Sequence, residues 1–532
     1  MKPPRDRTAL ALFIVLFSWY FLTTTSEAPK GDAFAPFLGA IQIVQGKGIL
    51  ASKVMPGQMF LLVPISLVTQ TVIRALHDDG ARRVAMILMN ALFPAIITAA
   101  TASILYRVLR RLGHARGIAT FAALLFGLAT PAAVYAKTFF PQPTEAFFLL
   151  ACVWGLVAAR DAQTAGAQAV GARAASAHTA STPAPSAPPE RAPLILSGLA
   201  FGALLLVKAV AVAYVPAAVL FVLFMRRDGR GAARLATWAI PALALSLLYL
   251  PYNAAARGGA LNFGYGVGRD ALWGFATPTL VGLHGLLLSP GKGFFYFAPA
   301  LVLAIPGAAR LARRDRAVAF LLGGLALGAL LLHAHWWAWH ADNAWGPRYL
   351  VPIIPLVTLA AAEALRDFRP RANLRTAALA ALIALSASLQ LLGAAFTNDA
   401  YQTLTYDIVL PRYRETDGAL GARDDELHLH WIPQFSPLAG HAWLARHALR
   451  GDAPDAYLAD YPWRALRPDG GWAPRVPDPP PRFDLWLAQL PRKYPTARGA
   501  LLAIALLAGA GIVAGAFVLA HGLRSPCPEL PR

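Results

Sequence analysis

The sequence has few charged residues for its length. Only 14% of its 532 residues are charged, whereas soluble globular proteins average about 25%. Two cysteines, Cys152 and Cys527, argue against a disulfide framework and against a cysteine-based metal site. No G-x-G-x-x-G signature follows a strand-like segment, which argues against a Rossmann nucleotide-binding domain. The composition therefore excludes an ordinary soluble protein.

Long apolar runs are what the sequence contains instead. Hydrophobic residues make up 57% of the chain, and many runs approach the ~17–25 residues that cross a bilayer. The pattern predicts an all-α polytopic membrane protein. About twelve transmembrane helices are expected, near 8–24, 84–106, 117–134, 143–160, 194–208, 210–225, 234–252, 294–310, 317–335, 349–365, 376–396 and 499–522. No A-x-A site follows the first run, so we interpret it as a retained span and not as a signal peptide.

The basic residues lie in alternate loops. A net charge of +20 is typical of nucleic-acid binding, but this placement is the one that membrane orientation requires. The positive-inside rule predicts that these loops and both termini are cytoplasmic, with no nucleic-acid partner. The basic segments are MKPPRDR, RVLRRLGHAR, 160–191, MRRDGR, ARLARRDR, RDFRPRANLR and HGLR.

The remaining connections are predicted to be external. They are 25–83, 135–142, the turn around Lys208, 253–293, 335–348 and 397–498. Residues 57–76 are long enough to span, but a span there would move every later basic loop outside. We therefore predict an external juxtamembrane or re-entrant element.

Three regions are expected. Residues 1–396 form a transmembrane module with an Ala/Ser/Pro-rich, disordered cytoplasmic linker at 161–193. Residues 397–498 form an external loop or small cap, and 499–532 form the last helix and a cytoplasmic tail. No internal repeat is evident, which argues against an inverted-repeat transporter.

Four single lysines lie near external helix ends, where the positive-inside rule predicts few cations. They are Lys53, Lys137, Lys208 and Lys292. Charges at such depths are expensive and often functional, and converging cations suit a phosphate or pyrophosphate. The alternative is snorkelling to lipid headgroups. Glycines flank Lys292, so backbone amides there could also approach an anion, unless the segment is only a turn.

The loop HWWAWHADNAWGPRYL (335–350) is unusually polar for a helix connection. An interfacial belt explains two or three of its four tryptophans, but not His340, Asp342 and Arg348 together. Arg348 can bind phosphate in a bidentate manner. Tryptophan faces suit the apolar face of a sugar ring or a polyprenyl chain, and Trp345, Tyr349, His340 and Asp342 are candidates for a substrate pocket.

Two acids are candidates for chemistry. Asp32 follows the first span by about eight residues and could act as a general base, or be a solvated or helix-capping acid. Glu145 begins the fourth span, where the helix dipole alone would favour an acid. His335, His340 and Asp342 fit no zinc motif, so no metal site is predicted. The sequence leaves open whether a divalent cation takes part.

Several segments, taken in order, resemble the GT-C superfamily. They are the acid after the first span, ASKVMPGQMF, GLATPAAVYAKTFFPQPTE, GLAFGALLLVKAVAVAYVP, SPGKGFFYFAP and WGPRYLVPIIPL. GT-C proteins are polytopic glycosyltransferases that use lipid-phosphate sugars. The resemblance covers about 8–396 and is to the bacterial branch near the protein O-mannosyltransferases and the lipid A aminoarabinose transferase.

The resemblance implies a catalytic acid in the first external loop, which corresponds to Asp32. It also implies cations that hold the lipid phosphate, which correspond to Lys53, Lys137, Lys208 and Arg348. The family often shows paired acids, or an acid beside an arginine, in the first loop, whereas GDAF has a single aspartate. This departure leaves room for another acceptor, or for Glu145 as the second acid.

The predicted function is inverting transfer of a sugar from a polyprenyl-phosphate donor. The acceptor would be a lipid, glycan or protein at the external, periplasmic face of the cell membrane. One alternative is a polysaccharide polymerase or ligase that uses lipid-pyrophosphate donors, which the 397–498 segment keeps open. Another is a transporter of a lipid-linked substrate, although acids deep within spans are not evident.

Overall fold

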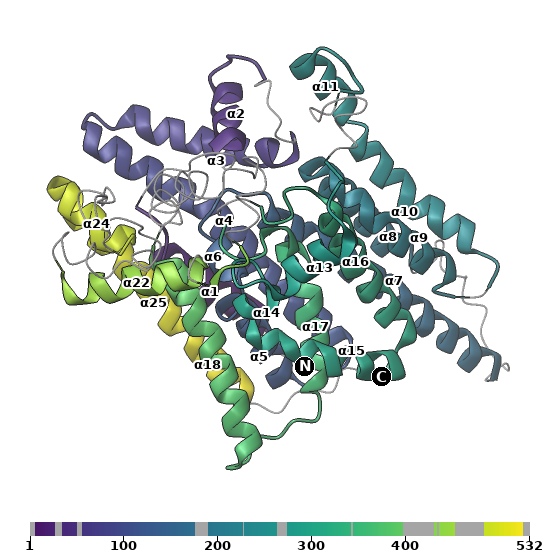
Figure 1. Cartoon of the computed structure of the whole chain (residues 1–532). Helices are drawn as coiled ribbons and strands as arrows, with labels where there is room; N and C mark the ends of the chain where they lie inside the picture. The colour runs from purple at the N-terminus through teal and green to yellow at the C-terminus, as the bar shows by residue number, and fades with distance from the viewer. Residues whose placement is uncertain are drawn as a thin grey trace.

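The structure is a computed structural model of the whole chain (Figure 1). It describes residues 6–26, 34–49, 56–175, 190–226, 228–262, 274–341, 344–396, 430–433, 436–452 and 483–524. Regular structure in these residues is entirely helical, with no strand among them. The predicted all-α class is confirmed for this part of the chain.

The helices occur in the following order. They are α1 (Thr8–Leu22), α2 (Phe34–Val44), α3 (Pro56–Ala75), α4 (Asp79–Arg111), α5 (Arg116–Leu128), α6 (Ala132–Tyr135), α7 (Gln142–Ala175), α8 (Arg191–Val207), η2 (Ala209–Tyr214), α9 (Val215–Phe224), α10 (Gly231–Ser246), α11 (Tyr249–Arg257), α13 (Thr279–Leu288), α14 (Phe294–Phe297), η3 (Pro299–Leu303), α15 (Ala304–Arg314), α16 (Arg316–His335), η4 (Arg348–Ile353), α17 (Ile354–Ala364), α18 (Leu374–Ala395), α22 (Pro437–Arg450), α24 (Trp486–Lys493), η8 (Pro495–Ala497) and α25 (Arg498–Arg524).

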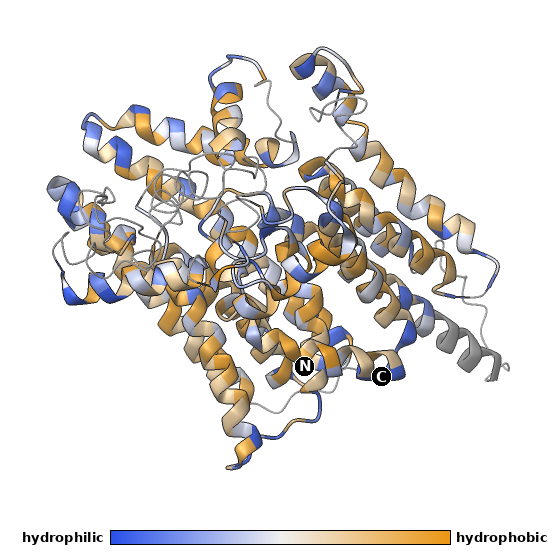
Figure 2. Ribbon diagram, viewed as in Figure 1, coloured by the Kyte–Doolittle hydropathy of each residue, from blue (hydrophilic) through white to orange (hydrophobic). Residues whose placement is uncertain are grey.

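Seven helical segments of the described chain are long and apolar enough to cross a membrane. They are Pro56–Ala75, Asp79–Arg111, Gln142–Thr164, Gly231–Arg257, Arg316–His335, Leu374–Ala395 and Pro495–Leu523. In Figure 2 hydrophobic residues run along the long helices, and hydrophilic residues collect at helix ends and connections. The chain is thus a multi-pass membrane protein, while the predicted count of twelve spans is not confirmed.

Two predicted segments differ from the structure. The span expected at 294–310 is broken after Phe297, where Ala298 has φ −142° and ψ 63°. Pro299 explains the break, because the residue before a proline avoids the α region.

The disordered linker expected at 161–193 is wrong over its first part, since helix α7 continues to Ala175. Alanine-rich sequence favours helix strongly. Residues 176–189 lie outside the described chain.

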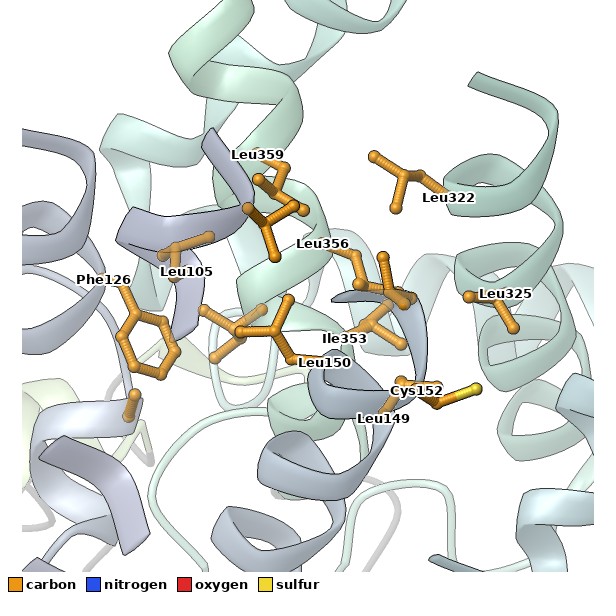
Figure 3. Close-up of a cluster of buried hydrophobic side chains, with 14 of the residues drawn as sticks. Leu105, Phe126, Leu149, Leu150, Cys152, Leu322, Leu325, Ile353, Leu356 and Leu359 are labelled. Carbon is orange, nitrogen blue, oxygen red and sulfur yellow. The ribbon is translucent and has the colours of Figure 1, made fainter. Parts of the chain in front are cut away.

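Helix α7 lies at the centre of the bundle. The apolar window of its candidate span is 78% buried, whereas that of α25 is 11% buried. Figure 3 shows Leu149 and Leu150 of α7 among Leu105 of α4, Phe126 of α5 and Leu356 of α17. The hydrophobic core is therefore built around one central helix, with α25 at its margin.

Polar contacts join the basic loops at one end of the bundle, which we call the basic end. They link Tyr106 to Asp6 (2.5 Å), Arg116 to the Gly522 carbonyl (2.5 Å), Arg160 to Asp315 (2.8 Å), Arg226 to the Gln163 carbonyl (3.4 Å) and Arg314 to Glu363 (2.8 Å). Loops that the charge pattern assigned to one side of the membrane therefore do lie together.

The connections predicted to be external also contact one another, at what we call the outer end. The contacts are Ser26 with Asp484 (2.7 Å), Gln58 with the Phe139 carbonyl (2.5 Å), Tyr135 with the Trp345 carbonyl (2.9 Å), Lys137 with the Ala394 carbonyl (2.5 Å) and Gly291 with the His430 carbonyl (3.0 Å). Which end faces the cytoplasm stays a prediction.

Helix α3 has both ends at the outer end. Gly57 lies against the backbone of Val207, where α8 ends. After Ala75 the chain enters α4, whose Gly80 lies against Tyr494, close to the contacts of α24 with α1. Although α3 is long and apolar enough to span, this arrangement favours the predicted juxtamembrane placement.

A glycine on α15 gives the first prediction. A β-carbon on Gly307 would collide with the Ala360 carbonyl of α17, whereas Gly323 of α16 has open space around its Cα. We expect Gly307→Ala to destabilise the fold by about 1–3 kcal/mol, the usual cost of overpacking, and Gly323→Ala to have little effect. Thermal unfolding in detergent measures both. Equal unfolding temperatures for the two variants would contradict the close α15–α17 packing.

Candidate active site

The predicted site residues that the structure describes all lie at the outer end. They are Lys137, Glu145, Lys208, Lys292, His340, Trp345, Arg348 and Tyr349. Lys208 and Tyr349 are half-buried and the others are buried. Asp32, Lys53 and Asp342 lie outside the described residues, so their predicted roles stay predictions.

Lys208 lies at a break between two helices. Helix α8 ends at Val207, and Lys208 has extended backbone (φ −155°, ψ 115°) before the 3₁₀ helix η2. Its amide donates to the Leu204 carbonyl at 3.0 Å, and its carbonyl accepts from the Ala211 amide at 3.1 Å. The predicted turn around Lys208 is confirmed. The break explains how one cation is accommodated within an otherwise apolar run.

Arg348 begins η4 and is held by aromatic rings. Its guanidinium carbon lies 4.5 Å from the centre of the Phe140 ring and 5.3 Å from that of Tyr349. Tyr349 in turn stacks on His333 of α16, with ring centres 4.7 Å apart. Such cation–π contacts orient a guanidinium. The chain turns into η4 at Gly346, whose φ of +60° favours glycine.

Glu145 lies in the first turn of α7, within electrostatic range of two cations. Its side chain is 3% exposed, and its Oε1 has no hydrogen-bond partner. Lys208 and Arg348 are both within electrostatic range of this carboxyl group. A buried carboxylate needs such opposite charges. The structure thus brings one acid and two cations together from α7, the break after α8, and η4.

Lys292 is completely buried, and its ammonium donates to the Ala344 carbonyl at 2.5 Å. The prediction that neighbouring amides could receive an anion is wrong, because these amides are already used. The Gly291 amide donates to the His430 carbonyl (3.0 Å) and the Gly293 amide to the Ser289 carbonyl (2.7 Å). The alternative interpretation, a turn, describes this backbone.

Lys137 belongs to a separate group that includes Asp484. Burial lowers the pKa of Lys137 to about 8, while the charge of Asp484 opposes that shift. Burial also raises the pKa of Asp484. The Asp484 carboxylate accepts hydrogen bonds from the Thr25 hydroxyl (2.5 Å) and from the Ser26 amide (3.1 Å). It therefore holds the chain immediately before the segment that contains Asp32.

His340 packs against a histidine that sequence reasoning missed. The ring centres of His340 and His430 are 4.6 Å apart. Burial lowers the pKa of His340 to about 3, and the charges of Lys292 and Arg348 add to the shift. Burial likewise lowers the pKa of His430. Both imidazoles are therefore neutral at pH 7.

Trp345 packs against other side chains of the bundle. Its indole nitrogen donates to Gln390 at 3.3 Å, and its ring lies against Phe297 and against His441 of α22. His441, like His430 and Asp484, comes from the region 397–498, for which the sequence offered no specific role. Contact with Trp345 places part of that region beside the site.

No group of three potential metal ligands among His, Cys, Asp and Glu occurs within the described residues. The charged side chains that act electrostatically on Glu145 are the cations Lys208 and Arg348. The described part of the site is therefore suited to an anion.

These features define a multi-pass membrane protein whose outer end holds buried cations. No protein-family model matches the chain, and no curated protein matches it. It is similar to the structure of ArnT from Cupriavidus metallidurans bound to undecaprenyl phosphate, with 16% identity and a TM-score of 0.48 over 84% of this chain and 80% of that one.

Two structures from Archaeoglobus fulgidus are also similar. One is an oligosaccharyltransferase tethered with an acceptor peptide (13% identity, TM-score 0.48). It is matched over 81% of this chain and 60% of that one. The other is the oligosaccharyltransferase AglB with an inhibitory peptide and a dolichol-phosphate (14%, TM-score 0.45), with the same coverage. The resemblance to the GT-C superfamily stays a prediction from the sequence.

The buried imidazoles predict how stability changes with pH. The pKa of His340 is depressed in the folded state, so the unfolded chain binds its proton first as the pH falls. Below about pH 6.5, the ordinary histidine pKa, His340 should therefore reduce stability by up to about 1.4 kcal/mol per pH unit. Thermal unfolding of His340→Gln between pH 7.5 and 5 should be less pH-dependent than that of the unmodified protein. Equal pH dependence would contradict the buried neutral imidazole.

Proposed function

We propose that the protein transfers a sugar from a polyprenyl-phosphate donor to an acceptor at the outer end. The observation that carries the proposal is the group formed by Glu145, Lys208 and Arg348, in which buried Glu145 begins a helix and the two cations lie where the α-helices are interrupted. Two cations at one place suit a phosphate, whose charge grows as it leaves the sugar. Fixed charges that stabilise a developing charge are often the largest contribution to catalysis.

The transfer is a single displacement. The acceptor oxygen attacks the anomeric carbon from the face opposite the phosphate, and the bond from that carbon to the phosphate oxygen breaks. The proton of the acceptor hydroxyl passes to Asp32. The sugar configuration therefore inverts, and polyprenyl phosphate is released as the leaving group.

The cations have a common role in this proposal. Arg348 binds the phosphate in a bidentate manner, as a planar guanidinium allows. Lys208 adds charge at the helix break. Lys53, Lys137 and Lys292 contribute to the positive potential around the donor. Glu145, His340, Asp342, Trp345 and Tyr349 line the remainder of the substrate pocket.

The orientation follows from the charge pattern. The basic end carries most arginines of the connecting loops and belongs in the cytoplasm by the positive-inside rule. The outer end then lies at the external or periplasmic face, and both termini are cytoplasmic. The activated donor is a lipid, so a nucleotide-binding domain is not needed.

A polymerase or ligase that uses lipid-pyrophosphate donors is a second candidate. Lys292 is within electrostatic range of His340, as is Arg348, and the additional cation would suit a second phosphate. A transporter of a lipid-linked substrate is a third candidate. Assays that offer polyprenyl-monophosphate sugars and pyrophosphate-linked oligosaccharides side by side separate all three. Transfer from the monophosphate donor is expected.

Removal of the charge at the helix break tests the donor site. Lys208→Met should weaken binding of undecaprenyl phosphate by about 1.5–3 kcal/mol, the size of a charge-assisted hydrogen bond. Lys47→Met is the matched control, because Lys47 is exposed in the connection after α2. Binding to detergent-purified protein measures both. Unchanged affinity in the Lys208 variant would remove Lys208 from the donor site.

Substitution of the proposed base tests the chemical step. Asp32→Asn keeps the shape of the side chain but cannot accept the proton. Transfer should fall by roughly 10²–10⁴-fold, the usual contribution of a general base. Binding of the donor should survive, since the loss lies in the transition state. Transfer at the unmodified rate would exclude Asp32 and make Glu145, and then Asp342, the next candidates.

A further inference from the structure

The indole Nε1 of Trp339 and the Nε2 of His430 are buried at the outer end without a hydrogen-bond partner. Trp339 is 0% exposed and His430 is 6% exposed. Buried polar groups in folded proteins are nearly always hydrogen-bonded, and leaving one unpaired costs about 1–3 kcal/mol. Two such atoms on neighbouring rings point to a polar group that the chain does not supply.

The two rings are neighbours, although they come from distant segments. Their centres are 6.0 Å apart, and each ring also contacts His340, at 5.7 Å for Trp339 and 4.6 Å for His430. Gly285 of α13 lets that helix approach the Trp339 ring, since a β-carbon there would lie 2.5 Å from it. The pair is thus fixed by packing on several sides.

The chemistry of the two atoms selects their partner. An indole nitrogen can only donate, while the Nε2 of a neutral imidazole can accept. A hydroxyl group both accepts and donates, so a single hydroxyl that lies between the two rings has the hydrogen-bonding capacity for both atoms. A carboxylate cannot donate to His430, and an ammonium cannot accept from Trp339. The charges of Lys292 and Arg348, both within electrostatic range of His340, also disfavour an ammonium.

We propose that Trp339 and His430 form a subsite that binds one hydroxyl group of an uncharged sugar. The proposal rests on the proposed function, because the sugar is the one that the lipid phosphate carries. Through His340, the subsite adjoins the cations assigned to the phosphate. Half-buried Trp431, 5.6 Å from Trp339 between ring centres, adds an aromatic surface beside the subsite.

The experiment compares lipid phosphate with and without a sugar. Trp339→Phe keeps an aromatic ring but removes the N–H group, and Trp336→Phe is the matched control in the same loop. Affinities are measured for undecaprenyl phosphate and for its glucosyl, mannosyl and arabinosyl derivatives. Trp339→Phe should weaken the best sugar-bearing lipid roughly 3–10-fold, the loss of one neutral hydrogen bond. Bare undecaprenyl phosphate should bind unchanged, and Trp336→Phe should alter neither.

His430→Phe is the second variant and should show the same selective loss. Equal weakening of bare and sugar-bearing lipids would assign both residues a structural role and overturn the subsite. Unchanged affinity for every lipid would mean that a buried water fills the pair, which also overturns it. If the unmodified protein does not bind bare undecaprenyl phosphate, the proposed function itself fails, and this outcome is distinct from the other two.

The charge of the sugar provides a separate test. In the unmodified protein, the arabinosyl lipid should bind more tightly than the same lipid with a protonated 4-amino group on the sugar. The nearby lysine and arginine charges repel that ammonium. Tighter binding of the amino sugar would overturn the assignment to an uncharged sugar.

Discussion

A charge buried in an apolar bundle must be compensated by another charge or by polar groups. At the basic end this requirement is met within the chain: Glu363 lies 3.0 Å from His114 and 2.8 Å from Arg314. At the outer end, buried lysines instead use backbone carbonyls, as Lys292 does with Ala344. The two ends therefore differ in chemistry: the buried Glu363 at the basic end is paired within the chain, and the described part of the outer end retains an excess of buried cations.

Irregular backbone at the outer end makes this arrangement feasible. The chain leaves α-helical geometry at Lys208, at Ala298 and at Arg348. Within a membrane, non-helical backbone is tolerated only where protein buries it or water reaches it. Each break lies in a packed region, and two of them carry the cations that flank Glu145. The same irregularities that interrupt the bundle thus supply the polar groups of the proposed site.

The sequence predicted the helices better than the contacts between them. Apolar runs and basic loops identified the helical segments and their grouping into two ends, because hydropathy and charge are local properties. Lys208 and Arg348 could be selected because each is a cation in an unusual place. His430 and Asp484 could not, since their importance arises from contacts such as Asp484 with Ser26, which are 458 residues apart. The broken helix at Pro299 could have been anticipated from the proline.

The burial of α7 has a consequence for how the protein is made. The 18-residue apolar window of its candidate span has a mean hydropathy of 1.4, against 2.5 for the window that includes α25, and Glu145 lies in its first turn. Acidic residues oppose insertion of an isolated helix into the bilayer. Because α7 packs against α4 and α8, its burial is complete only when a helix synthesised before it and one synthesised after it are both present. In the folded protein, other helices and not lipid therefore surround most of this span.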